Sequence, residues 1–322
     1  MTQISPTLPE KMEAAALDRF GGPEVLHPTT LPVPQPGTHQ VLILVETAGI
    51  GAWDPDVREG EFEIGKKRFP KVIGNDGAGV VVAVGDQVRR FHVGDPVYAY
   101  ASDGGFYAQY AAVKEAEVAP LPQGLRLEDA GVLAADGVTA LVGLEKVLRL
   151  RPGETLLVFG ASGGIGHLAV QLAKRMGARV IAVASGEDGV ALARRLGADG
   201  AVEGHRRDLL KALRELEPDG VDAALVLASK GASRALRVVK KGGRVAYPNG
   251  VEPEPEPPDG VKAEGYDGVP DPEVFERLNE LIAAGPFHVE IGKSYPLEAA
   301  AEAHRALKKH HLGKLALRVR SS

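Results

Sequence analysis

A short glycine-rich segment between an apolar stretch and a helical one constrains this chain more than any other feature. Residues 154–159 (ETLLVF) have the composition of a buried strand, and apolar residues at helical spacing follow at Ile165, Leu168, Leu172 and Met176. Glycines at G-x-x-G-x-x-G spacing permit a tight turn and let a diphosphate approach the amide groups at the helix N-terminus. Plain turns also use glycine, but the strand–turn–helix context favours a dinucleotide-binding turn. Its predicted cofactor contacts are Gly160, Ala161, Ser162, Gly163, Gly164, Ile165 and Gly166.

The surrounding sequence alternates between strand-like and helix-like segments. Strands are predicted at residues 179–183, 221–227 and 244–247, with amphipathic helical segments between them. Such alternation is typical of a parallel sheet with right-handed crossovers, which is a doubly wound α/β fold. We predict this domain over residues 136–284. In such a sheet the ends of the strands line the ligand cleft, so Ala228, Asn249 and Gly250 are further predicted cofactor contacts.

The first third of the chain follows a different pattern. Apolar, β-branched or aromatic runs bounded by turn residues occur at 41–45, 79–84 and 95–100, which predicts a mostly antiparallel β domain with short helices. Residues 1–11 are expected to form a loosely attached arm. The Pro- and Glu-rich residues 251–272 predict a surface loop or a lid, and a helix is predicted over about 272–284.

Composition excludes several classes of function. The chain of 322 residues has no cysteine, which excludes disulfides, thiolate catalysis and zinc sites that depend on sulfur ligands. The net charge of −5 with mixed signs gives no electrostatic footprint for nucleic acid. No apolar run approaches the roughly 18 residues of a membrane span, and no secretory signal is visible, so we expect a cytoplasmic protein without membrane partners.

The end of the second predicted strand bears on which dinucleotide binds. NAD-binding enzymes of this type usually place an acidic residue there, but this strand ends Val183-Ala184-Ser185. Ser185 could donate to the 2′-phosphate of NADPH, and a basic residue at Arg194, Arg206 or Arg207 could neutralise it. Ser185 and Arg206 are the predicted contacts. Ser185 could instead cap the following helix, and the neighbouring Glu187 and Asp188 would repel a phosphate, so NADH is the alternative.

Several ordered motifs give the chain a family resemblance over nearly its whole length. They lie at residues 20–26 (FGGPEVL), 48–60, 74–80 (GNDGAGV), 94–97 (GDPV), 137–140 (GVTA), 297–300 (LEAA) and 313–314 (GK). In this order they resemble the medium-chain dehydrogenase/reductase superfamily, and specifically its zinc-independent quinone oxidoreductase-like branch.

The resemblance implies two domains and the place of the site. A GroES-like catalytic domain is expected over residues 12–135 and completed by 285–322, with residues 136–284 as a Rossmann dinucleotide-binding domain. Cofactor and substrate are then expected in the cleft between the domains, and the chain is expected to form a homodimer. By the match to the family motifs, Thr139 and Lys314 are further predicted cofactor contacts.

The resemblance also bears on metal binding. Zinc-dependent relatives place their ligands where this chain has Gly51, Asn75 and Ala135, so no zinc is expected. The quinone oxidoreductase branch usually has Asn in place of Gly51, and NADP-binding relatives often have Lys and Tyr in place of Gly189 and Gly204. These departures weigh against NADPH and against quinone as the natural substrate.

The resulting hypothesis is an NADPH-dependent, zinc-free oxidoreductase that transfers hydride to a quinone or another α,β-unsaturated carbonyl compound. Such acceptors delocalise the developing charge and need little electrostatic assistance. The substrate cleft is predicted to include Gly51, Trp53, Asn75 and Asp76, although Trp53 could equally be core and Asn75-Asp76 a turn.

No proton donor is identified by the sequence. Asp54 and Arg58 are expected to form a structural ion pair on a helix, and Tyr107 and Tyr110 are expected to be ordinary strand packing. The alternatives are an enoyl-thioester reductase and a non-catalytic NADPH-binding protein with a regulatory or structural role.

Overall fold

The computed structural model describes residues 8–62, 65 and 68–320. The chain divides into two compact units. The first comprises Met1–Ala135, Pro270–Glu276 and Ile291–Ser322, and the second comprises Asp136–Val269 and Arg277–Glu290. Most of the predicted arm, residues 1–7, lies outside the described residues, whereas Lys11 already belongs to the first strand.

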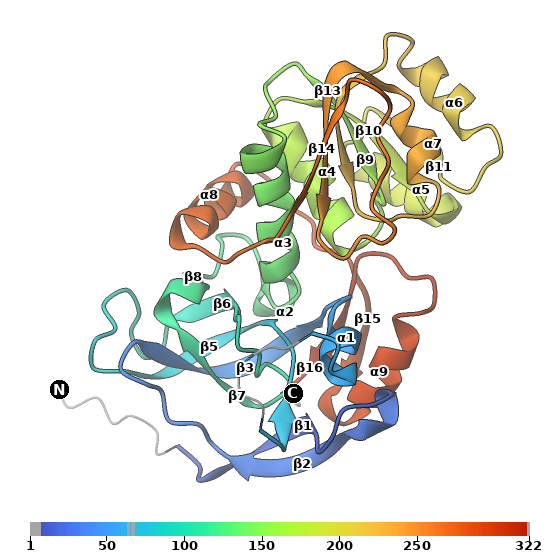
Figure 1. Ribbon diagram of the computed structural model, residues 1–322. Coiled ribbons are helices and arrows are strands. Elements are labelled where there is room, and N and C mark those ends of the chain that lie inside the picture. The colour runs from blue at the N-terminus through green and yellow to red at the C-terminus, as the bar shows by residue number, and fades with distance from the viewer. Residues whose placement is uncertain (1–7, 63–64, 66–67, 321–322) are drawn as a thin grey trace. The chain divides into compact units, whose positions relative to one another are not determined.

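A seven-stranded sheet, mostly antiparallel, forms the frame of the first unit (Figure 1). The long strand β3 (Gln40–Ile50) pairs with β5 (Asp76–Val84), β7 (Tyr110–Lys114) and β16 (Lys314–Arg318). The remaining strands of this sheet are β6 (Pro96–Tyr100), β8 (Val118–Pro120) and β15 (Ile291–Pro296), and β15 pairs with β16 in parallel. The expected antiparallel β domain is confirmed, and the C-terminal strands β15 and β16 complete its sheet.

A smaller sheet and short helices complete this unit. Strand β1 (Lys11–Leu17) lies between β2 (Leu26–Pro32) and β4 (Lys71–Val72). The helices are α1 (Asp54–Glu59), α2 (Leu127–Ala130) and α9 (Ala300–Ala306), with 3-10 turns at Pro23–Val25, Glu115–Glu117 and Leu297–Ala299.

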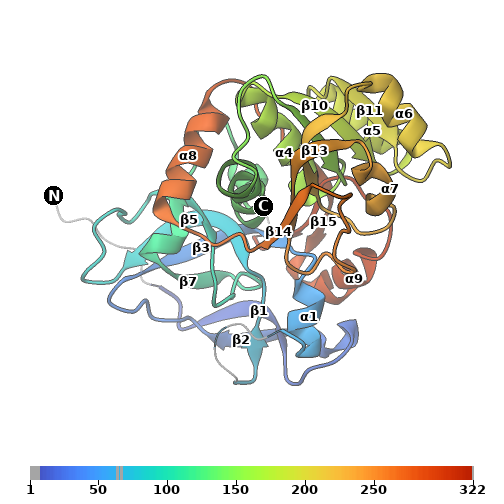
Figure 2. The same ribbon diagram turned by 45° about the horizontal axis from the view of Figure 1, so that its top comes forward.

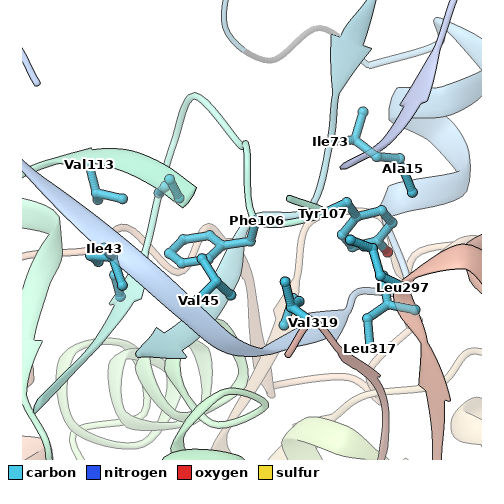
Figure 3. Packing of buried hydrophobic residues seen from close by; sticks show 14 of the residues in the cluster. Ala15, Ile43, Val45, Ile73, Phe106, Tyr107, Val113, Leu297, Leu317 and Val319 are labelled. Atoms are coloured by element: carbon cyan, nitrogen blue, oxygen red, sulfur yellow. The ribbon is translucent and has the colours of Figure 1, made fainter. Parts of the chain in front are cut away.

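The core of the first unit is formed by alternate residues of several strands (Figure 3). Ile43 and Val45 of β3 face the same side because side chains alternate along a strand, and they are fully buried. Phe106 and Tyr107 are also fully buried in this cluster. Tyr107 therefore carries a phenolic hydroxyl into an otherwise apolar core, where it needs a hydrogen-bond partner.

The second unit has the predicted doubly wound architecture (Figure 2). Its six strands follow the order β11-β10-β9-β12-β13-β14, and every neighbouring pair is parallel. The strands are β9 (Thr155–Phe159), β10 (Arg179–Ala184), β11 (Gly200–Glu203), β12 (Val221–Val226), β13 (Val239–Pro248) and β14 (Lys262–Tyr266). Its helices are α4 (Gly164–Arg175), α5 (Gly186–Arg195), α6 (Leu209–Leu216) and α7 (Ala232–Leu236). Two more helices are divided between the units: α3 (Ala134–Leu141), continued by a π-helical turn at Val142–Val147, belongs to the second unit from Asp136, and α8 (Pro272–Ala283) belongs to it from Arg277.

One prediction about this region was wrong. The Pro- and Glu-rich residues 251–272 were expected to form only a loop or lid, yet they contain β14, the edge strand of the parallel sheet. The sheet supplies the partner that composition could not reveal, because β14 pairs in parallel with β13 from Arg244 to Pro248. Tyr266 at its end is buried and donates a hydrogen bond from its hydroxyl to the Thr139 carbonyl at 3.0 Å.

The helix predicted over about 272–284 is confirmed as α8. Across the described ranges, no helix has both the length and the apolar composition that crossing a bilayer requires.

Candidate functional site

The glycine-rich turn connects β9 to α4 in the second unit, as the sequence predicts. Gly160 has a positive φ of 92°, a conformation that glycine adopts without strain. A Cβ on Gly166 would lie 2.1 Å from the Gly160 carbonyl oxygen, so only glycine permits this close packing of helix against strand. The Gly160 and Ala161 amides both donate to the Val183 carbonyl at 2.9 Å, which fixes the turn to β10.

The exposed side of this turn fits a diphosphate. A Cβ on Gly163 would meet only the Gly160 carbonyl oxygen, at 3.6 Å, so the backbone is open to close approach there. Gly163 is the N-cap of α4, no side chain caps that end, and the first turn has no acidic residue. Gly163, Gly164 and Ile165 are partly exposed, while Ala161 and Ser162 are buried. Helix N-terminal amides in this state bind anions.

At the end of β10, some groups favour and others disfavour binding of the 2′-phosphate of NADPH. Ser185 is the N-cap of α5 and makes no side-chain capping bond, while its amide donates to Ser162 Oγ at 3.3 Å. Glu203 of β11 lies beside Ala184 in the sheet and accepts hydrogen bonds from the Gly186 amide and from His205. The exposed Arg206 is paired with Asp208 through bonds of 2.6 and 2.8 Å.

Other predicted cofactor contacts follow the neighbouring strands. Ala228 comes after β12, and its amide nitrogen is 3.6 Å from the position of a Cβ on Gly160, so the structure places it beside the turn. Asn249 and Gly250 follow β13, and the Asn249 amide donates to the Tyr266 carbonyl at 2.8 Å. Thr139 lies on α3, where its hydroxyl packs against Gly268. The carboxyl ends of parallel strands meet at one edge of a sheet, which is where such folds bind ligands.

In the first unit, Gly51 follows β3 and donates its amide hydrogen to Asp54 Oδ2 at 2.8 Å. Trp53 precedes α1, is 38% exposed, and packs edge-on against Phe62 with 5.5 Å between ring centroids. The Asn75 side-chain amide donates to the Ala101 carbonyl at 3.0 Å. Of the predicted substrate residues, Gly51 and Trp53 thus lie on the short segment that leads from β3 into α1.

Asp76 and Lys314 form a buried ion pair. Their Oδ2 and Nζ atoms are 2.7 Å apart, and both side chains are at most 4% exposed. Asp76 Oδ2 also accepts a hydrogen bond from the Ala135 amide at 3.2 Å. A Cβ on Gly49 would lie 2.4 Å from Asp76 Oδ1, so β3 needs a glycine where the pair crosses it. Lys314 was predicted to contact a cofactor phosphate, and in this structure its ammonium group is engaged by Asp76.

Sequence reasoning missed a second buried polar group beside this pair. The Tyr107 hydroxyl lies 2.7 Å from Asp54 Oδ2 and 3.0 Å from His304 Nε2, and Arg58 Nη1 lies 2.8 Å from His304 Nδ1. Tyr107 was expected to be ordinary strand packing, but it precedes β7 and joins this group. Nothing in the sequence links these residues, because 197 positions separate Tyr107 from His304.

Burial perturbs the titration of this group. It raises the pKa of the Asp54 carboxyl from 3.8 to about 6, against the opposing effect of the Tyr107 and Gly51 hydrogen bonds. Desolvation, with help from the charge of Arg58, lowers the pKa of His304 from 6.5 to about 3. The pKa of Tyr107 is raised well above 10 by burial and by Asp54. At neutral pH, His304 and Tyr107 are therefore neutral.

The positions that hold zinc in related enzymes carry a poor donor set in this chain. Gly51 and Ala135 have no side-chain donor atoms, and the Asn75 amide is hydrogen-bonded to Ala101. Within residues 8–62, 65 and 68–320, no cluster of three or more His, Cys, Asp or Glu side chains is arranged to hold a metal ion.

Comparisons with known proteins agree on a family. Residues 37–123 match the family described as alcohol dehydrogenase GroES-like domain, and residues 164–259 match the family described as zinc-binding dehydrogenase. The chain is 35% identical over 312 residues to quinone oxidoreductase of Mus musculus, which covers 91% of this chain and 93% of that protein. It is 34% identical over 294 residues to 2-methylene-furan-3-one reductase of Solanum lycopersicum, which covers 88% and 72%.

A solved structure shares the fold over nearly the full length. A mycobacterial protein solved in complex with NADPH superimposes with a TM-score of 0.82 at 28% identity, covering 96% of this chain and all of that one.

Proposed function

Because this chain belongs to the medium-chain dehydrogenase/reductase superfamily, in its quinone oxidoreductase-like branch, we propose that it transfers hydride from NADPH to an electrophilic carbonyl compound without a metal. The substrate class is a quinone or another α,β-unsaturated carbonyl compound. The observation that carries the proposal is the open glycine turn between β9 and α4, with its uncapped helix N-terminus.

The fit of this turn supports dinucleotide binding independently of the relatives. Gly164 and Ile165 present backbone amides to the diphosphate, while the Gly163 amide donates to the Gly160 carbonyl at 3.2 Å and closes the turn. Gly166 lets α4 pack close to the strand that carries the turn. Ala228, Asn249, Gly250 and Thr139 would contact the remainder of the cofactor. When bound, a reduced nicotinamide supplies the hydride, and the protein supplies binding and orientation.

The donor set supports chemistry without zinc. Two of the three positions that would hold the metal, Gly51 and Ala135, offer no side-chain ligand, and the chain has no cysteine. Without a Lewis acid to polarise an unactivated ketone, an acceptor that spreads the incoming charge over a conjugated system is the better substrate. The names of two relatives, a quinone oxidoreductase and a furanone reductase, fit acceptors of this kind.

The preference for NADPH rests on Ser185, whose side chain caps no helix. The acidic side chains of Glu187, Asp188 and Glu203 would repel the 2′-phosphate. Arg206 would have to leave its ion pair with Asp208 to bind that phosphate. The expected preference for NADPH over NADH is therefore modest.

The test is a paired titration with NADPH and NADH, followed by turnover of each with 1,4-benzoquinone and with a short-chain enone, with and without a chelator. The proposal expects NADPH to bind and at least one acceptor to turn over at a rate that the chelator leaves unchanged. Binding without turnover of either acceptor would favour a non-catalytic NADPH-binding protein, and binding of neither cofactor would refute the proposal.

A further inference from the structure

Four buried side chains of the first unit form one continuous hydrogen-bonded chain. Arg58 and Asp54 come from α1, Tyr107 from the segment before β7, and His304 from α9. Each is at most 2% exposed. Core residues of this size would normally be apolar, because burying charged groups costs free energy even when they are paired.

The chemistry of the members fixes the direction of every hydrogen bond. A guanidinium can only donate, so His304 Nδ1 accepts from Arg58 and the ring proton lies on Nε2. The Nε2–H group then donates to the Tyr107 oxygen, and the Tyr107 hydroxyl donates to Asp54 Oδ2. The chain ends on a carboxylate that also accepts the Gly51 amide hydrogen.

We propose that Asp54 is a positioning residue for residues 50–53, the segment that carries the predicted substrate residues Gly51 and Trp53. Its carboxylate, oriented through Tyr107, His304 and Arg58, accepts the Gly51 amide hydrogen and fixes the backbone there. Protonation of the carboxylate weakens this hydrogen bond. This inference rests on the proposed function in one respect, because it takes Gly51 and Trp53 as part of the acceptor site. The hydrogen bond between the Gly51 amide and Asp54 lies within the first unit and does not depend on that function.

The geometry at Gly51 supports this role. A Cβ on residue 51 would lie 3.5 to 3.7 Å from the two Asp54 oxygens, so the segment after β3 runs directly against the carboxylate. A bond from a backbone amide to an ionised carboxylate is stronger than one to a neutral acid. The charge on Asp54 therefore decides how tightly residues 50–53 are held.

Burial, together with the neighbouring charges, sets the pH at which the Asp54 carboxyl takes up a proton. Asp54 is influenced by Asp76, which disfavours its charge, and by Lys314, which favours it. Arg58 is hydrogen-bonded to the Gly21 carbonyl, to Glu59 and to the neutral ring of His304. Burial is the largest influence and raises the pKa of Asp54 to about 6.

The first test measures amide hydrogen exchange of the segment 48–54 in the full protein between pH 5 and 8, corrected for the intrinsic pH dependence of exchange. Protection at Gly51 is expected to fall roughly fivefold to tenfold as the pH drops through about 6, the difference expected between a charge-assisted and a neutral hydrogen bond. In Asp54→Asn this pH dependence should be absent. Equal pH dependence in both proteins would overturn the proposal.

A second variant keeps the inference testable if Asp54→Asn does not fold. Tyr107→Phe retains the buried ring and removes one donor to Asp54, so the pH at which protection changes should rise by roughly one unit. Tyr98→Phe is the matched control, since Tyr98 is also fully buried in this unit and packs on Phe275. If Tyr98→Phe shifted the pH of the change in protection by the same amount, the effect would be a general loss of packing. That result would refute the role of the hydrogen-bonded chain from Arg58 to Asp54.

Kinetics separate this inference from the proposed function. With any acceptor that is reduced, KM for the acceptor should rise as the pH drops below about 6. Tyr107→Phe should shift the pH of this rise and leave Kd for NADPH at each pH as it is in wild type. If no acceptor is reduced, the proposed function fails while the exchange measurement still decides the role of Asp54. If the enzyme is active but KM for the acceptor does not change with pH, the positioning role of Asp54 is contradicted and the proposed function is not.

Discussion

At the scale of single residues, this protein keeps two histidines buried and neutral, one in each unit. His167 on α4 donates from Nδ1 to the Gly163 carbonyl, and its Nε2 accepts the Glu290 amide hydrogen at 3.0 Å. Burial lowers its pKa from 6.5 to about 4. His304 behaves in the same way in the first unit.

Acid should therefore destabilise the protein through His167. The unfolded state takes up the proton near pH 6.5 and the folded state only near pH 4, so this stability is complete above 6.5 and is lost as the pH falls. The depression of the pKa is worth roughly 3 kcal/mol at pH 4. Urea unfolding of wild type and His167→Gln should show the wild-type advantage shrinking by about that amount between pH 8 and 4, and His92→Gln, at an exposed position, should not.

Asp54 should have the opposite effect on stability. Its pKa is raised in the folded state, so its favourable contribution is present below pH 3.8 and is lost as the pH rises through about 6. The ionised form then costs on the order of 3 kcal/mol. Asp54→Asn should gain stability relative to wild type by about this amount between pH 4 and 8 in urea unfolding. A constant difference over that range would show that Asp54 is not perturbed by burial.

At the scale of elements, two glycines of one turn have separable roles. Gly166→Ala places a methyl group against the Gly160 carbonyl and should cost about 1–3 kcal/mol of stability. Gly163→Ala meets only one atom, at ordinary contact distance, so the melting temperature should change little. The same methyl group would stand where the diphosphate approaches, so NADPH should bind at least tenfold more weakly. Calorimetry of both variants with and without NADPH checks this, and unimpaired binding by Gly163→Ala would argue against the site.

The elements also show what a sequence can and cannot reveal. The turn at Gly160–Gly166 was predictable because strand, glycines and helix are contiguous and each has its own periodicity. Strand β14 was missed because its stability comes from pairing with β13, a partner that composition does not encode. The hydrogen-bonded chain from Arg58 to Asp54 was missed because only the tertiary fold brings its members together. His304 is a single histidine on a short helix, and nothing in the sequence around it indicates a buried polar contact.

At the scale of the whole molecule, the two units contribute different chemistry. The second provides the glycine turn that we propose binds the diphosphate, and the first provides buried charges beside the segment that leads from β3 to α1. The second unit has the expected doubly wound sheet, and the family relationship extends over both units.

The whole protein is expected to keep its stability and activity without zinc. Purified protein should contain substoichiometric zinc by elemental analysis, because the positions of Gly51 and Ala135 offer no ligand. Prolonged dialysis against a chelator should leave both the melting temperature and the turnover unchanged. Stoichiometric zinc whose removal abolishes activity would mean that the ligands lie elsewhere in the chain.

Hydride transfer from the nicotinamide can be followed directly with an isotope label. NADPH carrying deuterium at C4 of the nicotinamide, in either stereochemical position, is incubated with the protein and an enone in the presence of chelator. Deuterium from one of the two positions is expected on the β-carbon of the reduced product, and deuterium at the other position is expected to remain in the oxidised cofactor. Unchanged enone after NADPH and NADH have both been shown to bind, with benzoquinone also left unreduced, would contradict the proposed hydride transfer.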